Sequence, residues 1–187
     1  MRSMLRTSLL LTALSAVVAG AQTQAGSAAA KFPSMGESAP DFTATATDST
    51  GKQWPVSLKS MRGKVVVLAF YPGDRTRGCT AELTKFRDEY KAMFGEGVVV
   101  LPTSIDSLGS HTSWAKDAHF PFAMISDTKS ELAQMYGSAG GARPNFQRTV
   151  FVIGKDGKIT YTDTKFNALA EDGYVKLADE IKKAKGA

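Results

Sequence analysis

The chain alternates short, almost wholly apolar segments with amphipathic ones, and this alternation limits the folds open to it. Residues 64–71 (KVVVLAFY) and 97–104 (GVVVLPTS) are both rich in β-branched side chains. Runs of this length and composition are typical of strands covered on both faces. Shorter strands are expected at residues 122–125, 149–153 and 159–161, the last two joined as a hairpin.

Helical patterns separate these strands. In residues 79–94, Leu83, Phe86 and Tyr90 fall near one face of a helix, with charged side chains opposite. Further helices are expected at residues 107–118, 129–136 and 171–184, and a weakly marked hairpin at 42–58. The order of elements predicts an α/β fold, a three-layer sandwich with a central mixed sheet flanked by helices.

The N-terminus has the pattern of a secretory signal peptide. Arg2 and Arg6 precede an apolar stretch at residues 9–18, which is shorter than the roughly 20 residues of a membrane span. Small residues at 19–21 suit signal cleavage, although an uncleaved membrane anchor remains the alternative. We predict a signal peptide at residues 1–21, a flexible linker at 22–34 and one domain at 35–187. The mature protein is then periplasmic or extracellular, without stable membrane association.

Charge and composition exclude several classes of function. Removal of Arg2 and Arg6 lowers the formal net charge from +5 to +3, and the basic residues are interspersed with acidic ones. This distribution argues against nucleic-acid binding. One cysteine and two histidines match no zinc pattern, and no nucleotide-binding fingerprint is present. We therefore expect neither a metal nor a cofactor.

The chain contains a single cysteine, Cys79. In an exported protein, an unpaired thiol indicates an intermolecular disulfide or a reactive site. Cys79 follows a strand that ends at Pro72, and it begins the next helix, where free backbone amides and the helix dipole favour thiolate over thiol. Thr76 can place its hydroxyl beside the sulfur. The alternatives are a small buried hydrophobe at Cys79 and a simple helix N-cap at Thr76.

The pattern Pro72-x-x-x-Thr76-x-x-Cys79, continued by Glu82, resembles the active-site signature of the peroxiredoxins. Its longer form, YPxDxTxGCTxE, is most similar to the bacterioferritin comigratory protein branch of that family. The resemblance covers roughly residues 35 to 185. Other segments that carry it are residues 36–42, 104–114, 121–127 and 148–157.

This resemblance implies a thioredoxin-like fold and a thiol-dependent peroxidase that reduces hydrogen peroxide and organic hydroperoxides. Cys79 would be the peroxidatic cysteine and would become a sulfenic acid. Thr76 would hydrogen-bond the substrate oxygen and the sulfur, and Arg148 would hold the thiolate and the peroxide electrostatically. Pro72 would shield the site from water, and Glu82 would orient the arginine. The alternatives are a surface charge at Arg148 and, at Glu82, a residue that only favours a helix N-terminus.

The sequence departs from the pattern of that branch at Thr84. Many members carry a resolving cysteine five residues after the first, and this chain has no second cysteine anywhere. The resemblance therefore implies a one-cysteine mechanism. An external thiol, from a small molecule, a thioredoxin-like protein or a second copy bridged through Cys79, must reduce the sulfenic acid. We expect a monomer or a homodimer.

Two other functions use the same residues. An exported redox sensor or interaction module would oxidise Cys79 with little turnover, and a thioredoxin-fold scaffold would keep it inert. A Cys-His pair would suggest acyl transfer, but His111 lies in a segment that the family carries away from its site. We therefore interpret His111 as structural.

Overall fold

The computed structural model describes residues 32–140 and 145–186. The predicted signal peptide and most of the predicted linker lie outside these residues, so the predicted domain boundaries stay predictions. Within the described ranges, every helix is too short or too polar to cross a bilayer.

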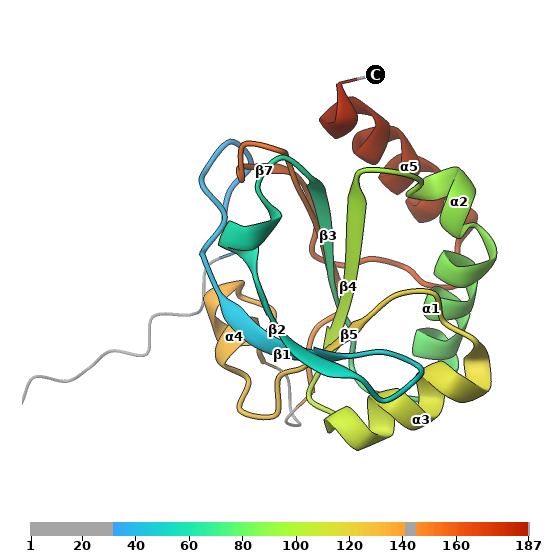
Figure 1. Ribbon diagram of the computed structural model, residues 1–187. Coiled ribbons are helices and arrows are strands. Elements are labelled where there is room, and N and C mark those ends of the chain that lie inside the picture. Colours follow the sequence, from blue (N-terminus) through green and yellow to red (C-terminus); the bar gives the residue numbers. More distant parts are fainter. Residues whose placement is uncertain (1–31, 141–144, 187) are drawn as a thin grey trace, which may run out of the picture.

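A seven-stranded mixed sheet forms the centre of the molecule (Figure 1). Its strands are β1 (Thr43–Thr47), β2 (Gln53–Ser57), β3 (Val65–Phe70), β4 (Val98–Ser104), β5 (Met124–Ser126), β6 (Thr149–Ile153) and β7 (Ile159–Asp163). They lie in the order β2-β1-β5-β4-β3-β6-β7. The strands β3, β4 and β5 are parallel, whereas β1, β2, β6 and β7 join through antiparallel pairings. The weakly marked hairpin of the sequence is present as β1 and β2.

Strand β3 is central in the sheet, between β4 and β6, and it is buried on both faces because side chains of the helices and turns pack against each of them. Its alternate residues contribute to two separate hydrophobic cores. One core lies under α1 (Arg77–Asp88), α2 (Tyr90–Met93), α3 (Leu108–Ala118) and α5 (Glu171–Lys185). The other lies under the 3-10 turn η1 (Leu58–Met61) and α4 (Glu131–Met135). Figure 1 shows these helices on opposite sides of the sheet, which confirms the predicted three-layer sandwich.

Helix α1 packs one stripe of side chains onto the first core. Cys79, Leu83 and Phe86, spaced by four and three residues, are all fully buried. Burial of a side chain such as Phe86 contributes on the order of 2–3 kcal/mol. The single helix predicted over residues 79–94 begins two residues earlier and divides at Glu89, where the backbone leaves the helical region. After this bend, the ring of Phe94 packs edge-on against Phe86, with 5.3 Å between centroids.

Candidate active site

The loop between β3 and α1 contains Pro72 and Thr76, the first two residues of the sequence pattern. Strand β3 makes its last ladder bond at Tyr71, whose amide donates to the Thr103 carbonyl at 3.0 Å. Pro72, which has no amide proton, follows directly and is half-buried. The chain then turns through residues 73–76 and enters α1 at Arg77.

Cys79 is the third residue of α1 and is fully buried. The amides of a first helical turn have no carbonyl partner within their helix and carry the positive end of its dipole. Thr76 is the N-cap residue, but within the described structure its side chain caps no amide of α1. Its hydroxyl donates instead to the Gly73 carbonyl at 3.2 Å. Cys79 therefore lies in the first turn of a helix, as expected, and the Thr76 side chain makes no hydrogen bond to the amides of that turn.

Arg148 reaches Cys79 from a distant part of the sequence. Strand β6 pairs antiparallel with β3 in a register that sets Thr149 opposite Phe70. Residue 148 consequently lies just beyond the end of β3, beside the loop. Its Nη2 lies 3.2 Å from the Sγ of Cys79. The guanidinium is thus within hydrogen-bond range of the sulfur, as the predicted role of Arg148 requires.

Glu82 lies one turn after Cys79 and is fully buried. Its Oε2 accepts a hydrogen bond from Nη1 of Arg148, and the two side chains form an ion pair. Burial raises the pKa of Glu82 to about 7, although Arg148 partly offsets this rise. Burial opposes the charge of Arg148, but the nearby Glu82 and Cys79 outweigh it and raise the pKa of Arg148. One guanidinium therefore bridges the predicted nucleophile and the predicted orienting carboxylate.

Gly78 is a site residue that the sequence reasoning missed. A Cβ atom at this position would lie 3.0 Å from Nη2 of Arg148, the nitrogen that contacts the sulfur. A contact of this length is tighter than nine in ten real Cβ contacts, so the guanidinium would have to shift by a few tenths of an ångström. Glycine at 78 therefore makes room for the guanidinium over the first turn of α1. The Gly-Cys pair in the sequence was the available signal.

His111, interpreted from the sequence as a structural residue, contacts the loop that precedes Cys79. Its ring is fully buried in α3, and Nδ1 lies 2.9 Å from Oδ2 of Asp74. Asp74 lies two residues before Thr76 in the sequence. The loop is consequently tied to α3 by a buried polar contact that no motif in the sequence indicated.

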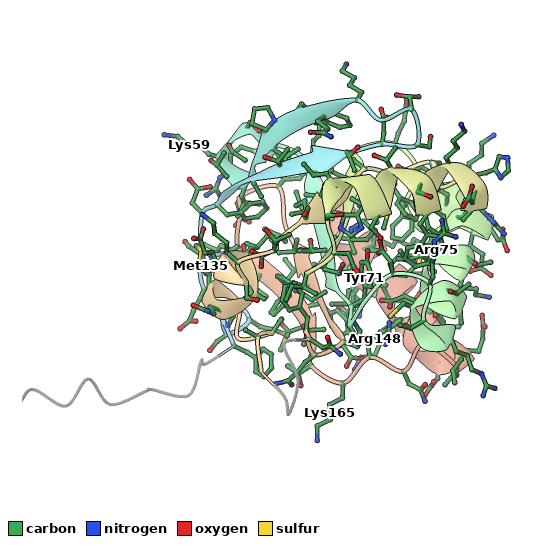
Figure 2. The ribbon with its side chains drawn as sticks, turned by 90° about the horizontal axis from the view of Figure 1, so that it is seen from below. Lys59, Tyr71, Arg75, Met135, Arg148 and Lys165 are labelled. Carbon is green, nitrogen blue, oxygen red and sulfur yellow. The ribbon has the colours of Figure 1, made fainter. Side chains whose placement is uncertain are left out.

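Of the five predicted site residues, the structure brings Cys79, Arg148 and Glu82 into one hydrogen-bonded group. Pro72 and Thr76 lie on the adjoining loop, and Thr76 is exposed. Their roles in shielding the site and binding peroxide stay predictions. In Figure 2, Arg75 and Arg148 lie toward one side of the molecule and Met135 toward the other.

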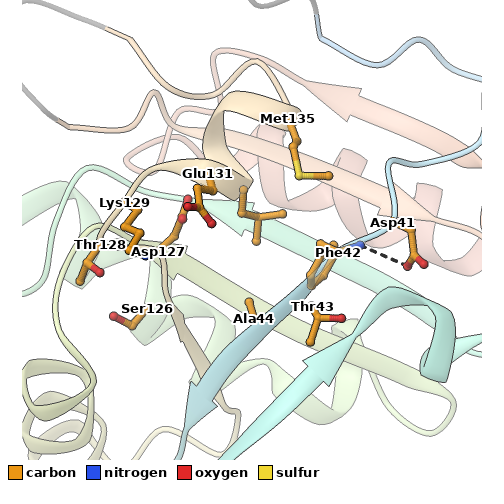
Figure 3. A pocket seen from close by; sticks show the side chains of 11 residues that line it. Asp41, Phe42, Thr43, Ala44, Ser126, Asp127, Thr128, Lys129, Glu131 and Met135 are labelled. Atoms are coloured by element: carbon orange, nitrogen blue, oxygen red, sulfur yellow. Dashed lines mark hydrogen bonds between the residues drawn. The ribbon is translucent and has the colours of Figure 1, made fainter.

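A pocket of about 320 Å³ lies on the other core, between the start of β1 and α4 (Figure 3). It is lined by polar and apolar side chains that include Asp41, Asp127 and Met135. The carboxylate of Asp127 already accepts the amide of Ala133 at 2.8 Å. None of the five predicted site residues lines this pocket.

Comparison with known proteins identifies the family of the chain. Residues 35–162 match the AhpC/TSA family. The chain belongs to the AhpC/TSA family of peroxiredoxins. A bcp peroxiredoxin of Coxiella burnetii is 35% identical over 147 residues, which cover 75% of this chain and 93% of that protein. Peroxiredoxin 2 of Thermoplasma acidophilum is 40% identical over 125 residues, which cover 64% of this chain and 60% of that longer protein.

The solved structures give the same fold. Peroxidoxin BcpB of Mycobacterium tuberculosis superposes with a TM-score of 0.70 at 26% sequence identity. The match covers 81% of this chain and 97% of that protein. The expected thioredoxin-like peroxiredoxin fold is thereby confirmed. The residues that match the family, 35–162, include β3 and α1, and Cys79 lies in α1.

Proposed function

We propose that this protein is an exported thiol peroxidase that reduces hydrogen peroxide and organic hydroperoxides through Cys79. The observation that carries the proposal is the 3.2 Å contact between Nη2 of Arg148 and the Cys79 sulfur at the start of a helix. The thiolate is the nucleophilic form of cysteine, and the Arg148 cation in contact with the sulfur is placed to interact with its negative charge. Family membership supports the same reaction class.

In the first half-reaction, the thiolate attacks one oxygen of the peroxide and the oxygen–oxygen bond breaks. The sulfur gains an S–OH group, and the other oxygen leaves as hydroxide or alkoxide, which takes a proton to become water or an alcohol. Negative charge spreads in the transition state from sulfur to the departing oxygen. Arg148 and the first-turn amides of α1 supply donors at that place, and donors of this kind lower the barrier.

In the second half-reaction, an external thiol attacks the sulfenic acid, releases water and forms a mixed disulfide with Cys79. A second thiol then displaces Cys79 as a thiolate and leaves as a disulfide with the first. The chain has no other cysteine to do this. Because Cys79 is fully buried, the approach of a thiol requires the loop or the first turn of α1 to move.

Stopped-flow mixing with hydrogen peroxide tests the assignment. We expect hydrogen peroxide to oxidise the thiol of the parent rapidly. The Cys79→Ser variant has no thiol and should not react. Peroxide consumption at the parent rate by the variant would contradict the proposal. A turnover assay with dithiothreitol separates the enzyme from a redox sensor, because a sensor would stop after one equivalent of peroxide while an enzyme would continue.

Export is a separate part of the proposal and is supported by the charged and apolar pattern of residues 1–21. Expression of the full chain in a host with a periplasm, followed by mass measurement of the purified protein, tests it. We expect loss of residues 1–21. A full-length mass in the cytoplasmic fraction would contradict export and leave the peroxidase assignment intact.

A further inference from the structure

Asp74 is the polar centre of the loop that joins Pro72 to Thr76. Its side chain is only 4% exposed. The carboxylate accepts hydrogen bonds from the hydroxyl of Tyr71 at 2.7 Å and from the hydroxyl of Ser110 at 2.6 Å. The backbone amide of Asp74 donates to Oδ2 of Asp106 at 2.8 Å. One loop residue is therefore bonded to the end of β3, to α3 and to the segment after β4.

His111 completes this arrangement from the interior. Its Nδ1 lies 2.9 Å from the Asp74 carboxylate, and its Nε2 lies 3.1 Å from the carbonyl of Ile125 on β5. Both of these partners are hydrogen-bond acceptors, so the ring of His111 is held at two points, by the loop and by β5. Burial and the nearby Asp74 raise the pKa of Tyr71, which keeps its hydroxyl a donor. The Asp74 carboxylate thus contacts Tyr71, Ser110 and His111.

The next residue, Arg75, is attached to the same helix. Its backbone has a φ of 59°, in the left-handed region that residues other than glycine rarely adopt. Its guanidinium donates to the hydroxyl of Ser113 at 3.0 Å and to Asp117 at 2.6 Å, both on α3. Two consecutive loop residues, Asp74 and Arg75, are therefore bonded to α3. The left-handed backbone of Arg75 turns the chain just before α1 begins.

Thr76 depends on this anchored turn. It is extended, with φ −73° and ψ 153°, and its hydroxyl donates back across residues 74 and 75 to the Gly73 carbonyl. Thr76 is the N-cap residue of α1, and the third residue of that helix is Cys79. Because the proton of Thr76 is used on Gly73, its oxygen is left to accept the proton of a bound peroxide.

We propose that Asp74 and His111 are positioning residues for peroxide reduction, which hold the loop so that Thr76 and the first turn of α1 face the peroxide. This inference rests on the proposed peroxidase function. In the described structure, neither residue bonds the sulfur. The pair therefore acts on the reaction with peroxide, and the intrinsic reactivity of the Cys79 thiolate does not depend on it.

The test compares two reactions of the single cysteine. Oxidation by hydrogen peroxide needs the aligned loop. Alkylation by iodoacetamide needs the thiolate and, because Cys79 is fully buried, movement of the loop or the first turn of α1, but it does not need Thr76 to be aligned. We expect Asp74→Asn and His111→Gln to slow oxidation about 10- to 100-fold and alkylation less than about threefold. In turnover with dithiothreitol, KM for peroxide rises while kcat stays near the parent value, because reduction limits kcat. Asp48→Asn is the matched control, since that carboxylate bonds Thr50 and Lys52 on the β1–β2 turn.

Equal losses in oxidation and alkylation would overturn the proposal in favour of a purely structural role, and so would parent-like oxidation in both folded variants. If Asp74→Asn does not fold, Tyr71→Phe and Ser110→Ala each remove one bond to Asp74 without changing a charge. Slower oxidation with unchanged alkylation in these variants would support the proposal, and parent-like oxidation in both would overturn it. Failure of the parent and of Asp48→Asn to react with peroxide would instead contradict the proposed function itself.

Discussion

Asp74 lies in the loop before Cys79 and Glu82 lies one helical turn after it, and both carboxylates are shielded from solvent. Burial opposes the charge of Asp74, but hydrogen bonds from His111 and Ser110 outweigh it and lower the pKa of Asp74. Glu82 has Arg148 on one oxygen, and its Oε1 has no partner among residues 32–140 and 145–186. Burial prevails there and raises the pKa of Glu82 to about 7. Glu82 is completely buried with one donor and its pKa is raised, whereas at Asp74 the several donors together outweigh burial.

The two carboxylates consequently suit different tasks. Asp74 is a constant anchor for the loop at neutral pH. Glu82 shares the guanidinium that contacts the sulfur, and its own charge changes near neutral pH. The comparison predicts four measurable differences.

The largest effect is expected from removal of the shared cation. Arg148→Ala takes away the donor at the Cys79 sulfur and leaves Glu82 buried without its partner. We expect the rate constant for oxidation by hydrogen peroxide to fall about 10²- to 10³-fold. Arg148→Lys is expected to restore little, because one ammonium cannot reproduce the bridge from Sγ to Glu82. Arg62→Ala is the control, since that exposed guanidinium bonds the backbone of Asp156, and a similar loss there would refute the assignment.

The second prediction concerns the pH dependence of stability. The folded protein binds the Glu82 proton more tightly than the unfolded chain does, since the pKa rises from 4.5 to about 7. The stability linked to that proton is full below about pH 4.5 and is lost as the pH rises through 7. Relative to Glu82→Gln, the free energy of unfolding of the parent should fall by on the order of 3 kcal/mol across this range. Urea denaturation between pH 4.5 and 8 measures it.

Parallel pH profiles for the parent and Glu82→Gln would contradict the raised pKa of Glu82. Asp74 has the opposite linkage. Its lowered pKa supplies stability that is present above its ordinary value of 3.8 and is lost only as the pH falls below it. The Asp74 contribution therefore stays constant over the range in which Glu82 titrates.

The third prediction separates activity from stability at Gly78. In Gly78→Ala the new Cβ displaces the Arg148 guanidinium by a few tenths of an ångström or more, so we expect about a tenfold slower oxidation by peroxide. Alanine also favours the helix, so stability should be unchanged or rise by about 0.5–1 kcal/mol. Stopped-flow and urea denaturation give both values. Gly109→Ala is the control, because its Cβ meets nothing closer than 3.9 Å, and equal oxidation rates in both variants would argue against the close approach.

The smallest effect is expected at the exposed anchor of the same loop. The side chains of Arg75 and Asp117 are 49% and 60% exposed, so water competes for their ion pair. Asp117→Asn should change the free energy of unfolding by less than about 1 kcal/mol and the oxidation rate by less than about twofold. A loss as large as that of Asp74→Asn would show that the exposed and buried anchors are equivalent.

The sequence predicted much of the fold because hydrophobic periodicity is a local signal. The strands at residues 65–70, 98–104 and 149–153 and the helix that holds Cys79 follow directly from it. The break of that helix at Glu89 was missed, because it depends on how Phe94 packs against Phe86. The 3-10 turn at Leu58–Met61 was missed too, since four residues carry no usable period.

The candidate site divides in the same way. Cys79, Thr76 and Pro72 lie in one continuous motif, and the motif predicted Glu82 as well. Asp74 stood inside that motif without an assigned role, because its partners Ser110 and His111 lie 36 and 37 residues away in the sequence. Gly78 was missed because it contributes only by lacking a side chain, which leaves space for the guanidinium of Arg148.

The sequence by itself determined that the chain has one thiol, that this thiol begins a helix after a buried strand, and that any disulfide it forms must be with another molecule. Only the tertiary structure decided what surrounds that thiol. Arg148 is 69 residues away along the chain, and it reaches the sulfur because β6 pairs with β3 in the register that sets Thr149 opposite Phe70. A change of one residue in that register would turn alternate side chains to the other face of the sheet and take the cation away from Cys79.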